Sequence, residues 1–226
     1  MKKIITIDGP SGAGKGTISQ LVAQKLNWQF LDSGAMYRLC GLACVKQGIS
    51  FKDEAAVETL AKQLDIEFKL DGDSLLTLLN GEEVTAQLRT EETAAAASNV
   101  APIPAVRAAL LERQRSFATD QGLIADGRDM GTVVFTDAPL KIYLTASAEE
   151  RAQRRYKQLT LAGESVSMRA ILEDIQARDE RDMNRSVAPL KPADDAVEID
   201  STDMTIEQVL AQILRLTQEK FAEFTQ

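Results

Sequence analysis

The sequence predicts an α/β fold of three layers, in which helices cover both faces of a five-stranded parallel sheet. Short apolar runs alternate with longer segments of helical periodicity along most of the chain. The first run, residues 3–8, is mostly apolar, which is typical of a parallel strand that is buried on both faces. The 226 residues contain no internal repeat and no low-complexity linker. We therefore expect one domain with an insertion rather than two equal domains.

The first predicted strand covers residues 3–8, and a predicted helix covers residues 18–26. Between them lies a glycine-rich loop that ends in Lys15 and Thr17. Strand, glycine-rich loop, lysine and helix in this order are the context of a phosphate-binding P-loop. The glycines let backbone N–H groups turn toward phosphate oxygens, and the lysine adds a positive charge. We predict that phosphate binds to Gly9, Pro10, Ser11, Gly12, Ala13, Gly14, Lys15, Gly16 and Thr17.

One position of this loop departs from the usual motif. Gly16 stands where most P-loops have the serine or threonine whose hydroxyl reaches magnesium. Thr17 follows one residue later. This ending is typical of nucleoside monophosphate kinases and leaves the direct metal ligands unassigned.

The next segments continue the α/β pattern and then interrupt it. A strand over residues 28–31 is followed by helices over residues 35–47 and 53–64, and Gly48 fits a helix C-cap. The following segment predicts an antiparallel meander. Its strands are residues 65–70, which alternate apolar and polar, residues 74–79 and residues 82–84, joined by turns at Asp71-Gly72 and Asn80-Gly81. This insertion is interpreted either as a mobile lobe on the substrate side or as a surface decoration.

The rest of the chain returns to helices and buried strands. Helices are predicted over residues 85–99, 105–119, 148–161 and 167–184, and strands over residues 122–126, 141–145 and 197–200. A last helix starts at Ser201 or Thr205 and is expected to reach the core through Ile206, Val209, Leu210, Ile213 and Leu214.

Composition excludes several classes of function. The net charge of −8 argues against a general nucleic-acid binder. No apolar run approaches the length of a bilayer span, and the first strand begins almost at the N-terminus. We therefore expect a cytoplasmic protein that binds neither membrane nor nucleic acid and acts as a monomer. The absence of histidine excludes a Ser-His-Asp triad and leaves Cys40 and Cys44 as reduced core thiols.

Arginines are concentrated in one region. Half of them lie between Arg151 and Arg185. Such a cluster is either a salt-bridged helical face or an anion site, and the P-loop in the same chain favours the anion site. Four arginines are expected to be solvated surface charges: Arg113, Arg115, Arg151 and Arg169.

Four separated segments together resemble the bacterial cytidylate kinase family: GPSGAGKGT, LDSGAMYR, ADGRDMGTVVF and RDERDMNR. The resemblance covers essentially the whole chain. It implies a single P-loop kinase domain over residues 1–226, an acceptor-nucleotide insertion over residues 35–105 and a helical lid over residues 151–165. The implied reaction is phosphoryl transfer from ATP to CMP or dCMP with Mg²⁺ as cofactor.

The resemblance also implies a role for individual residues. Arg154 and Arg155 would bind ATP, and the residues acting on the transferred phosphoryl group would be Lys15, Arg128, Arg178 and Arg185. The acceptor phosphate would contact Tyr37, Arg38, Arg128 and Arg185, the cytosine would contact Ser33, Ser98, Arg107 and Asp129, and Asp182 would bind the sugar hydroxyls. A carboxylate such as Asp129 accepts from the cytosine amine and repels the uracil carbonyl.

Two other functions remain open on the sequence. One is another small-molecule P-loop kinase, and the other is a nucleotide-binding switch without an acceptor. Asp182 is also compatible with an ordinary ion pair within a helix, although the density of arginines around it favours a binding role. Asp126 is compatible with a simple strand end or with a water-mediated magnesium contact.

Overall fold

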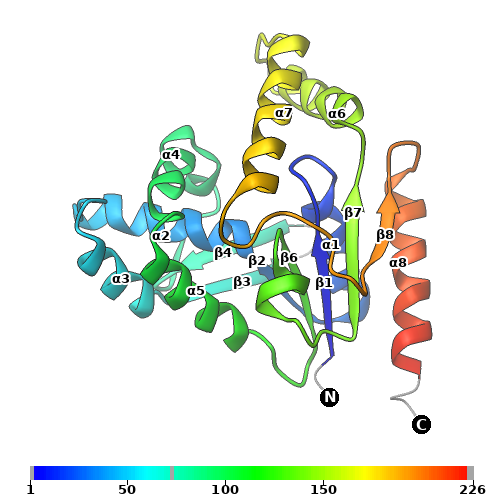
Figure 1. The fold of residues 1–226 in the computed structure, drawn as a ribbon, viewed down its shortest axis with the longest axis horizontal. Helices are drawn as coiled ribbons and strands as arrows, with labels where there is room; N and C mark the ends of the chain where they lie inside the picture. Colours follow the sequence, from blue (N-terminus) through cyan, green and yellow to red (C-terminus); the bar gives the residue numbers. More distant parts are fainter. Residues whose placement is uncertain (1–2, 72–73, 223–226) are drawn as a thin grey trace.

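The larger of two sheets runs through the centre of the molecule (Figure 1). The structure, a computed structural model, describes residues 3–71 and 74–222. Five parallel strands form this sheet in the order β2-β6-β1-β7-β8. They are β1 (Ile4–Asp8), β2 (Gln29–Asp32), β6 (Leu123–Gly127), β7 (Leu140–Thr145) and β8 (Val197–Asp200). The predicted five-stranded parallel sheet is confirmed.

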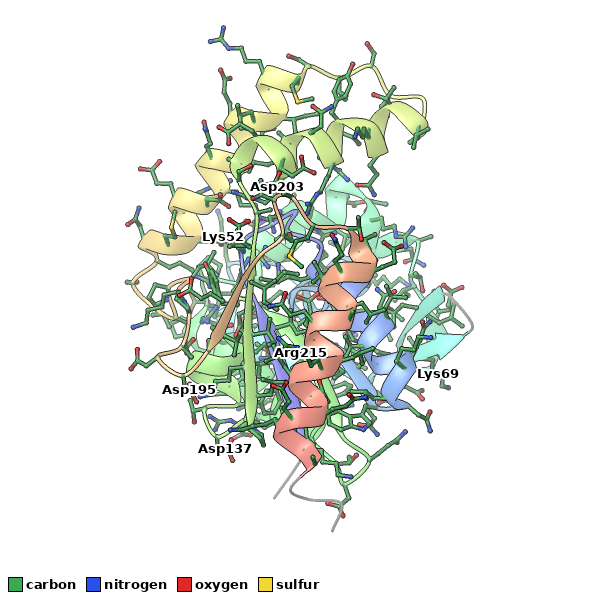
Figure 2. All side chains as sticks on the ribbon, turned by 90° about the vertical axis from the view of Figure 1, so that its right-hand side faces the viewer. Lys52, Lys69, Asp137, Asp195, Asp203 and Arg215 are labelled. Carbon is green, nitrogen blue, oxygen red and sulfur yellow. The ribbon has the colours of Figure 1, made fainter. Side chains whose placement is uncertain are left out.

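Helices cover both faces of this sheet. On one face, α1 (Lys15–Leu26) and α8 (Ile206–Phe221) pack with Ile5 and Ile7 of β1 in one hydrophobic cluster. On the other face, Ile4 joins a second cluster with α2 (Ser33–Gln47), α5 (Pro104–Ser116) and the π-helical turn η2 (Met130–Val134). Figure 2 shows α8 as an outer layer, with the exposed Arg215 on it. The three layers follow from the alternation of side chains along each strand.

The small second sheet is the predicted antiparallel meander. It consists of β3 (Ile66–Asp71), β4 (Ser74–Leu79) and β5 (Glu82–Glu83). The ring of Phe68 lies 6.1 Å from that of Phe30 and 5.8 Å from that of Phe117, so the meander packs on the main body. Asn80 and Gly81 both have positive φ, as the predicted tight turn requires. The turn predicted at Asp71-Gly72 lies partly outside the described residues, which omit 72–73.

Two long helices stand beyond the carboxyl ends of the strands (Figure 1). They are α6 (Ala148–Leu161) and α7 (Met168–Asn184), which pack against each other. Ser147 and Ser167 cap them by accepting hydrogen bonds from the N–H groups of Glu150 and Ala170. Both helices agree with the predicted ranges to within one residue.

Three details of the prediction are wrong. The helix predicted over residues 85–99 is divided into a 3₁₀ turn, η1 (Gln87–Arg89), and α4 (Glu91–Val100). Thr90 is extended between them and caps α4, because its hydroxyl accepts from the N–H of Thr93 at 3.2 Å. The helix predicted to reach residue 119 ends at Ser116. Ile206 is 50% exposed at the start of α8 and is not part of the core.

The remaining elements agree with expectation. A short helix, α3 (Glu54–Gln63), packs on α5. Cys40 and Cys44 are buried free thiols, as predicted. Within the described parts of the chain, no single helix is both long and apolar enough to cross a membrane. The bent pair of residues 92–100 and 104–116 meets that test together, by length and composition only.

Candidate active site

Two clefts adjoin at the carboxyl edge of the parallel sheet. The P-loop follows β1, Asp32 ends β2, and Arg128 follows β6, so these segments meet at the same edge. One cleft of about 820 Å³ contains P-loop residues 11–17 and parts of α6 and α8. The other, of about 920 Å³, is bordered by α2, β4, α4 and α7.

The P-loop has the conformation that its glycines predict. Gly12 and Gly14 have φ of 80° and 89°, in the left-handed region that favours glycine. Gly14 caps α1, which begins at Lys15, so the helix N-terminus faces the smaller cleft. Gly9 and Pro10 lie behind this surface, where a Cβ on Gly9 would collide with the carbonyl of Leu144. Their part in the loop is to shape its backbone.

Lys15 is buried among charged groups of both signs. Its Nζ donates to the carbonyl oxygen of Pro10 at 2.8 Å. Burial and, next, the nearby Arg128 guanidinium lower the pKa of Lys15, the carboxylates of Asp126, Asp8 and Asp32 raise it, and the net pKa is about 8. The loop therefore holds a desolvated cation where nucleotide phosphates would lie.

Asp126 lies beside the loop at the unusual motif position. A Cβ on Gly16 would lie 3.5 Å from Oδ2 of Asp126, so glycine leaves this carboxylate uncovered. Burial raises the pKa of Asp126, Lys15 lowers it and Asp32 raises it, and the net pKa is about 7. A cation near this carboxylate would be favoured.

All residues predicted for the acceptor line the larger cleft: Ser33, Tyr37, Arg38, Ser98, Arg107, Arg128, Asp129, Asp182 and Arg185. They come from α2, α4, α5, α7 and the segment after β6. The structure thus brings together residues that are separated by up to about 150 positions in the sequence.

Two ion pairs organise this cleft. Arg107 Nη2 donates to Asp129 Oδ2 at 3.3 Å, and Arg128 Nε donates to Asp182 Oδ2 at 2.9 Å. The guanidinium of Arg107 also lies 5.7 Å from the centre of the Tyr37 ring. Asp182 therefore does pair with an arginine, but with one from another segment rather than within its own helix.

Arg185 differs from the other cleft arginines. Its Nε and Nη2 are buried, and neither has a hydrogen-bond partner among residues 3–71 and 74–222. Buried donors without acceptors are costly, and an oxyanion in the cleft would satisfy them. Arg38, by contrast, donates from Nη1 to the carbonyl of Leu88 at 2.7 Å.

The other predicted residues lie at the rims. The Ser98 hydroxyl is exposed and donates to the Ala94 carbonyl at 3.1 Å. Arg178 lines the larger cleft, and its pKa is lowered by loss of solvent and then by Arg128. Arg154 and Arg155 line the smaller cleft. Arg154 also donates to the carbonyl of Ser201 at 2.7 Å.

The two clefts meet at a shared wall. Asp32, Gly34, Gly127 and Arg128 line both of them. A group bound at the P-loop and a group bound in the larger cleft would therefore approach each other beside Arg128. Such an arrangement is suited to transfer between two bound anions.

Sequence reasoning was wrong about Arg151. It is buried, not solvated, and pairs with Asp179 of α7 through Nη1 and Nη2 at 3.1 and 2.6 Å. Its Nη1 also donates to the carbonyl of Ser11 in the P-loop at 3.0 Å, and its Nε to that of Ala146 at 2.9 Å. A carboxylate 28 residues away gives no local sequence signal for such a contact.

The chain matches the family model described as cytidylate kinase over residues 5–219. It belongs to the cytidylate kinase family. It is 54% identical over 223 residues to a cytidylate kinase of Aeromonas salmonicida, covering 99% of this chain and 97% of the relative. It is 58% identical over 214 residues to one of Pseudomonas aeruginosa, with 94% and 93% coverage. Membership of the cytidylate kinase family was predicted from the four segments and is confirmed.

A solved structure has a similar fold. An uncharacterized protein from Eubacterium ventriosum has a TM-score of 0.52 and 12% sequence identity, covering 97% of this chain and 99% of that chain. At this identity the likeness concerns the fold alone.

Proposed function

We propose that this protein transfers the γ-phosphoryl group of ATP to CMP or dCMP, giving ADP and CDP or dCDP. The observation that carries the proposal is the pair of clefts that meet at Arg128, one formed by the P-loop and the other containing the Arg107–Asp129 pair. Family membership supports the same reaction. An alcohol kinase or a nucleotide switch binds no acceptor phosphate. Neither would therefore need Arg185, whose buried Nε and Nη2 donors lack partners among the described residues.

The smaller cleft suits the donor nucleotide. The N-terminus of α1, the loop glycines and Lys15 face its interior and would hold the β- and γ-phosphates. Arg154 and Arg155 on α6 would add positive charge from the opposite side. We propose that residues 151–165 act as a lid, because closure would exclude water that otherwise hydrolyses ATP.

The larger cleft suits a cytidine monophosphate. Asp129 would accept a hydrogen bond from the cytosine amine, and Arg107 would donate to the cytosine ring acceptors. Ser33 and Ser98 would make further base contacts, and Asp182 would bind a sugar hydroxyl. Residues 35–105 would form the acceptor-binding insertion, since β4 contributes Leu75, Leu76 and Thr77 to the cleft.

The acceptor phosphate would be held next to the shared wall. Tyr37, Arg38, Arg128 and Arg185 would bind it, and Arg178 would join Lys15 in neutralising the transferred phosphoryl group. Both substrates are anions, so several fixed cations are needed to bring them together. Arginine provides planar, paired donors for phosphate oxygens.

Magnesium fits this site only together with the nucleotide. Within residues 3–71 and 74–222, no three carboxylate or cysteine side chains could hold a metal ion by themselves. Asp126 and Thr17, which line the smaller cleft, would hold Mg²⁺ that is also bound by ATP. The ion would neutralise phosphate charge, and a bound cation would stabilise the ionised form of Asp126, whose pKa is raised chiefly by burial.

The proposal also covers partners and place of action. We propose that the protein acts as a monomer. The net charge of −8 argues against a nucleic-acid partner. We propose a cytoplasmic enzyme of pyrimidine nucleotide metabolism.

Purified protein with ATP and Mg²⁺ is expected to phosphorylate CMP and dCMP with a much higher kcat/KM than UMP or AMP. A coupled assay of ADP formation over the monophosphates measures this. ADP formation without any acceptor would support the switch instead. Equal or faster turnover of UMP or AMP would contradict the cytidine assignment.

Asp129→Asn is expected to lower the ratio of kcat/KM for CMP over UMP by about ten- to a hundredfold. An amide can donate to the uracil carbonyl, whereas the carboxylate repels it. The KM for ATP should change little, because Asp129 does not line the smaller cleft. Asp137→Asn, at an exposed position labelled in Figure 2, is the matched control. An unchanged CMP/UMP ratio for Asp129→Asn would rule out this role in base recognition.

A further inference from the structure

We infer that Asp8 is a positioning residue that fixes the base-reading segment Arg128-Asp129 relative to the P-loop. The inference rests on the proposed function and extends it to a residue outside both clefts. Asp8 lines neither cleft, and only 5% of its surface is exposed. It would act on the acceptor through the backbone that it holds.

Asp8 is placed firmly by the centre of the sheet. It is the last residue of β1, and it pairs with Gly127 of β6 on one side and Tyr143 of β7 on the other. The P-loop begins at the next residue, Gly9, which packs closely against the backbone of β7. Any group bonded to the Asp8 side chain is therefore held at a fixed position relative to the donor loop.

Both carboxylate oxygens of Asp8 bond to the segment that follows β6. Oδ1 accepts from the N–H of Met130 and Oδ2 from the N–H of Gly131, each at 2.8 Å. These two residues come directly after Arg128 and Asp129, which make the two ion pairs of the acceptor cleft. Asp8 therefore anchors the chain one residue beyond the proposed reader of cytosine.

The close approach depends on a glycine. A Cβ on Gly131 would lie 3.0 Å from Oγ1 of Thr6, 3.1 Å from Cδ of Lys141 and 3.4 Å from Oδ2 of Asp8. Such contacts are tighter than, or at the limit of, ordinary packing, so a side chain would push the Gly131 N–H away from Asp8. A substitution at either Asp8 or Gly131 would thus weaken the hydrogen bond between them.

The charge state of Asp8 agrees with two accepted bonds. Burial raises its pKa, the two backbone N–H groups lower it, the Asp129 carboxylate raises it and Lys15 lowers it, so that the net pKa is about 6. At neutral pH the group is therefore mainly ionised, and both oxygens accept. Asparagine would retain one acceptor but present an amide N–H to a backbone N–H.

The test compares steady-state constants of Asp8→Asn with those of the parent enzyme. We expect the KM for CMP to rise about tenfold or more, as for loss of a buried bond to a charged group, and CMP/UMP selectivity to fall. The KM for ATP should change less than the KM for CMP, because the P-loop backbone keeps its own contacts and Asp8 reaches the ATP site only through its charge on Lys15. A merely structural role would affect both substrates equally.

Gly131→Ala provides a second route if Asp8→Asn folds poorly. It should show the same selective loss for the acceptor. Asp53→Asn is the matched control, because Asp53 also accepts from a backbone N–H, that of Ala56 at 3.1 Å, but caps the remote helix α3. Its kinetic constants should equal those of the parent.

Combination with Asp129→Asn identifies the path of the effect. If Asp8 acts through Asp129, the double variant should lose less CMP/UMP selectivity than the product of the two single losses. The inference would be overturned if both Asp8→Asn and Gly131→Ala kept the parent KM for CMP and the parent CMP/UMP selectivity. It would also be overturned if the selectivity loss of the double variant equalled the product of the two single losses. If the parent enzyme itself fails to prefer CMP, the proposed function fails instead, so the two results are distinguishable.

Discussion

Lys15→Met is expected to lower kcat by about 10²–10³, the effect of removing one preorganised donor from a developing anion. Lys15 is largely buried at the edge of the smaller cleft, where its ammonium group donates to the Pro10 carbonyl at 2.8 Å and would turn toward a bound phosphate. Methionine keeps the length of the stem and removes the charge. The KM for CMP should change little, because Lys15 does not line the acceptor cleft.

Single-turnover and steady-state measurements with ATP test this expectation. Lys62→Met is the control, since Lys62 is exposed on α3 and pairs with Glu58 at 2.6 Å. It should keep the parent kcat. A Lys15→Met variant that retains parent kcat while remaining folded would contradict the role of Lys15 in stabilising the transferred phosphoryl group.

The pH dependence of the same residue follows from its environment. The ammonium form is the acid form, so charge is lost as pH rises through the pKa of about 8. The kcat/KM for ATP, which reports the free enzyme, should therefore decline above about pH 8. Lys15→Arg keeps its charge throughout this range and should remove the decline.

The fold could be predicted because its signals are local. Each buried strand of the parallel sheet is a short apolar run, and the spacing of the glycines and the lysine in the P-loop predicts the β1–α1 unit. The helix that was predicted as continuous over residues 85–99 is interrupted because Thr90 caps α4. The periodicity of apolar residues does not predict such a cap. Ile206 has the right spacing for the core but is half exposed in the first turn of α8, whereas Val209 of the same helix is buried.

The site was predictable as a set of residues but not as a set of contacts. The P-loop motif and the family resemblance together named residues of both clefts, and all of these except Gly9 and Pro10 line a cleft in the structure. Which arginine pairs with which carboxylate depends on the register of distant segments. Asp182 is an example, because its partner is Arg128 and not an arginine of its own helix.

Arg151→Met is expected to lower the free energy of unfolding by about 3–5 kcal/mol, since removing one partner of a buried ion pair leaves the other charge uncompensated. The Arg151 and Asp179 side chains are only 5% and 14% exposed, so water would solvate the remaining unpaired charge poorly. The substitution also removes the donors to Ser11 and Ala146. Thermal or urea unfolding measures the loss, on the order of 10 °C in Tm for a chain of this size.

Arg169→Met is the matched control for this loss. Arg169 forms an i,i+4 pair with Glu173 at 2.7 Å, but its side chain is 88% exposed, so the free energy of unfolding should change by about 0.5 kcal/mol or less. Combining Arg151→Met with Asp179→Leu should restore part of the stability, because two apolar side chains leave no unpaired charge. If the double variant were no more stable than Arg151→Met, the loss would come from the carbonyls of Ser11 and Ala146. The buried arginine would then stabilise the P-loop through those carbonyls rather than by joining the loop to α7.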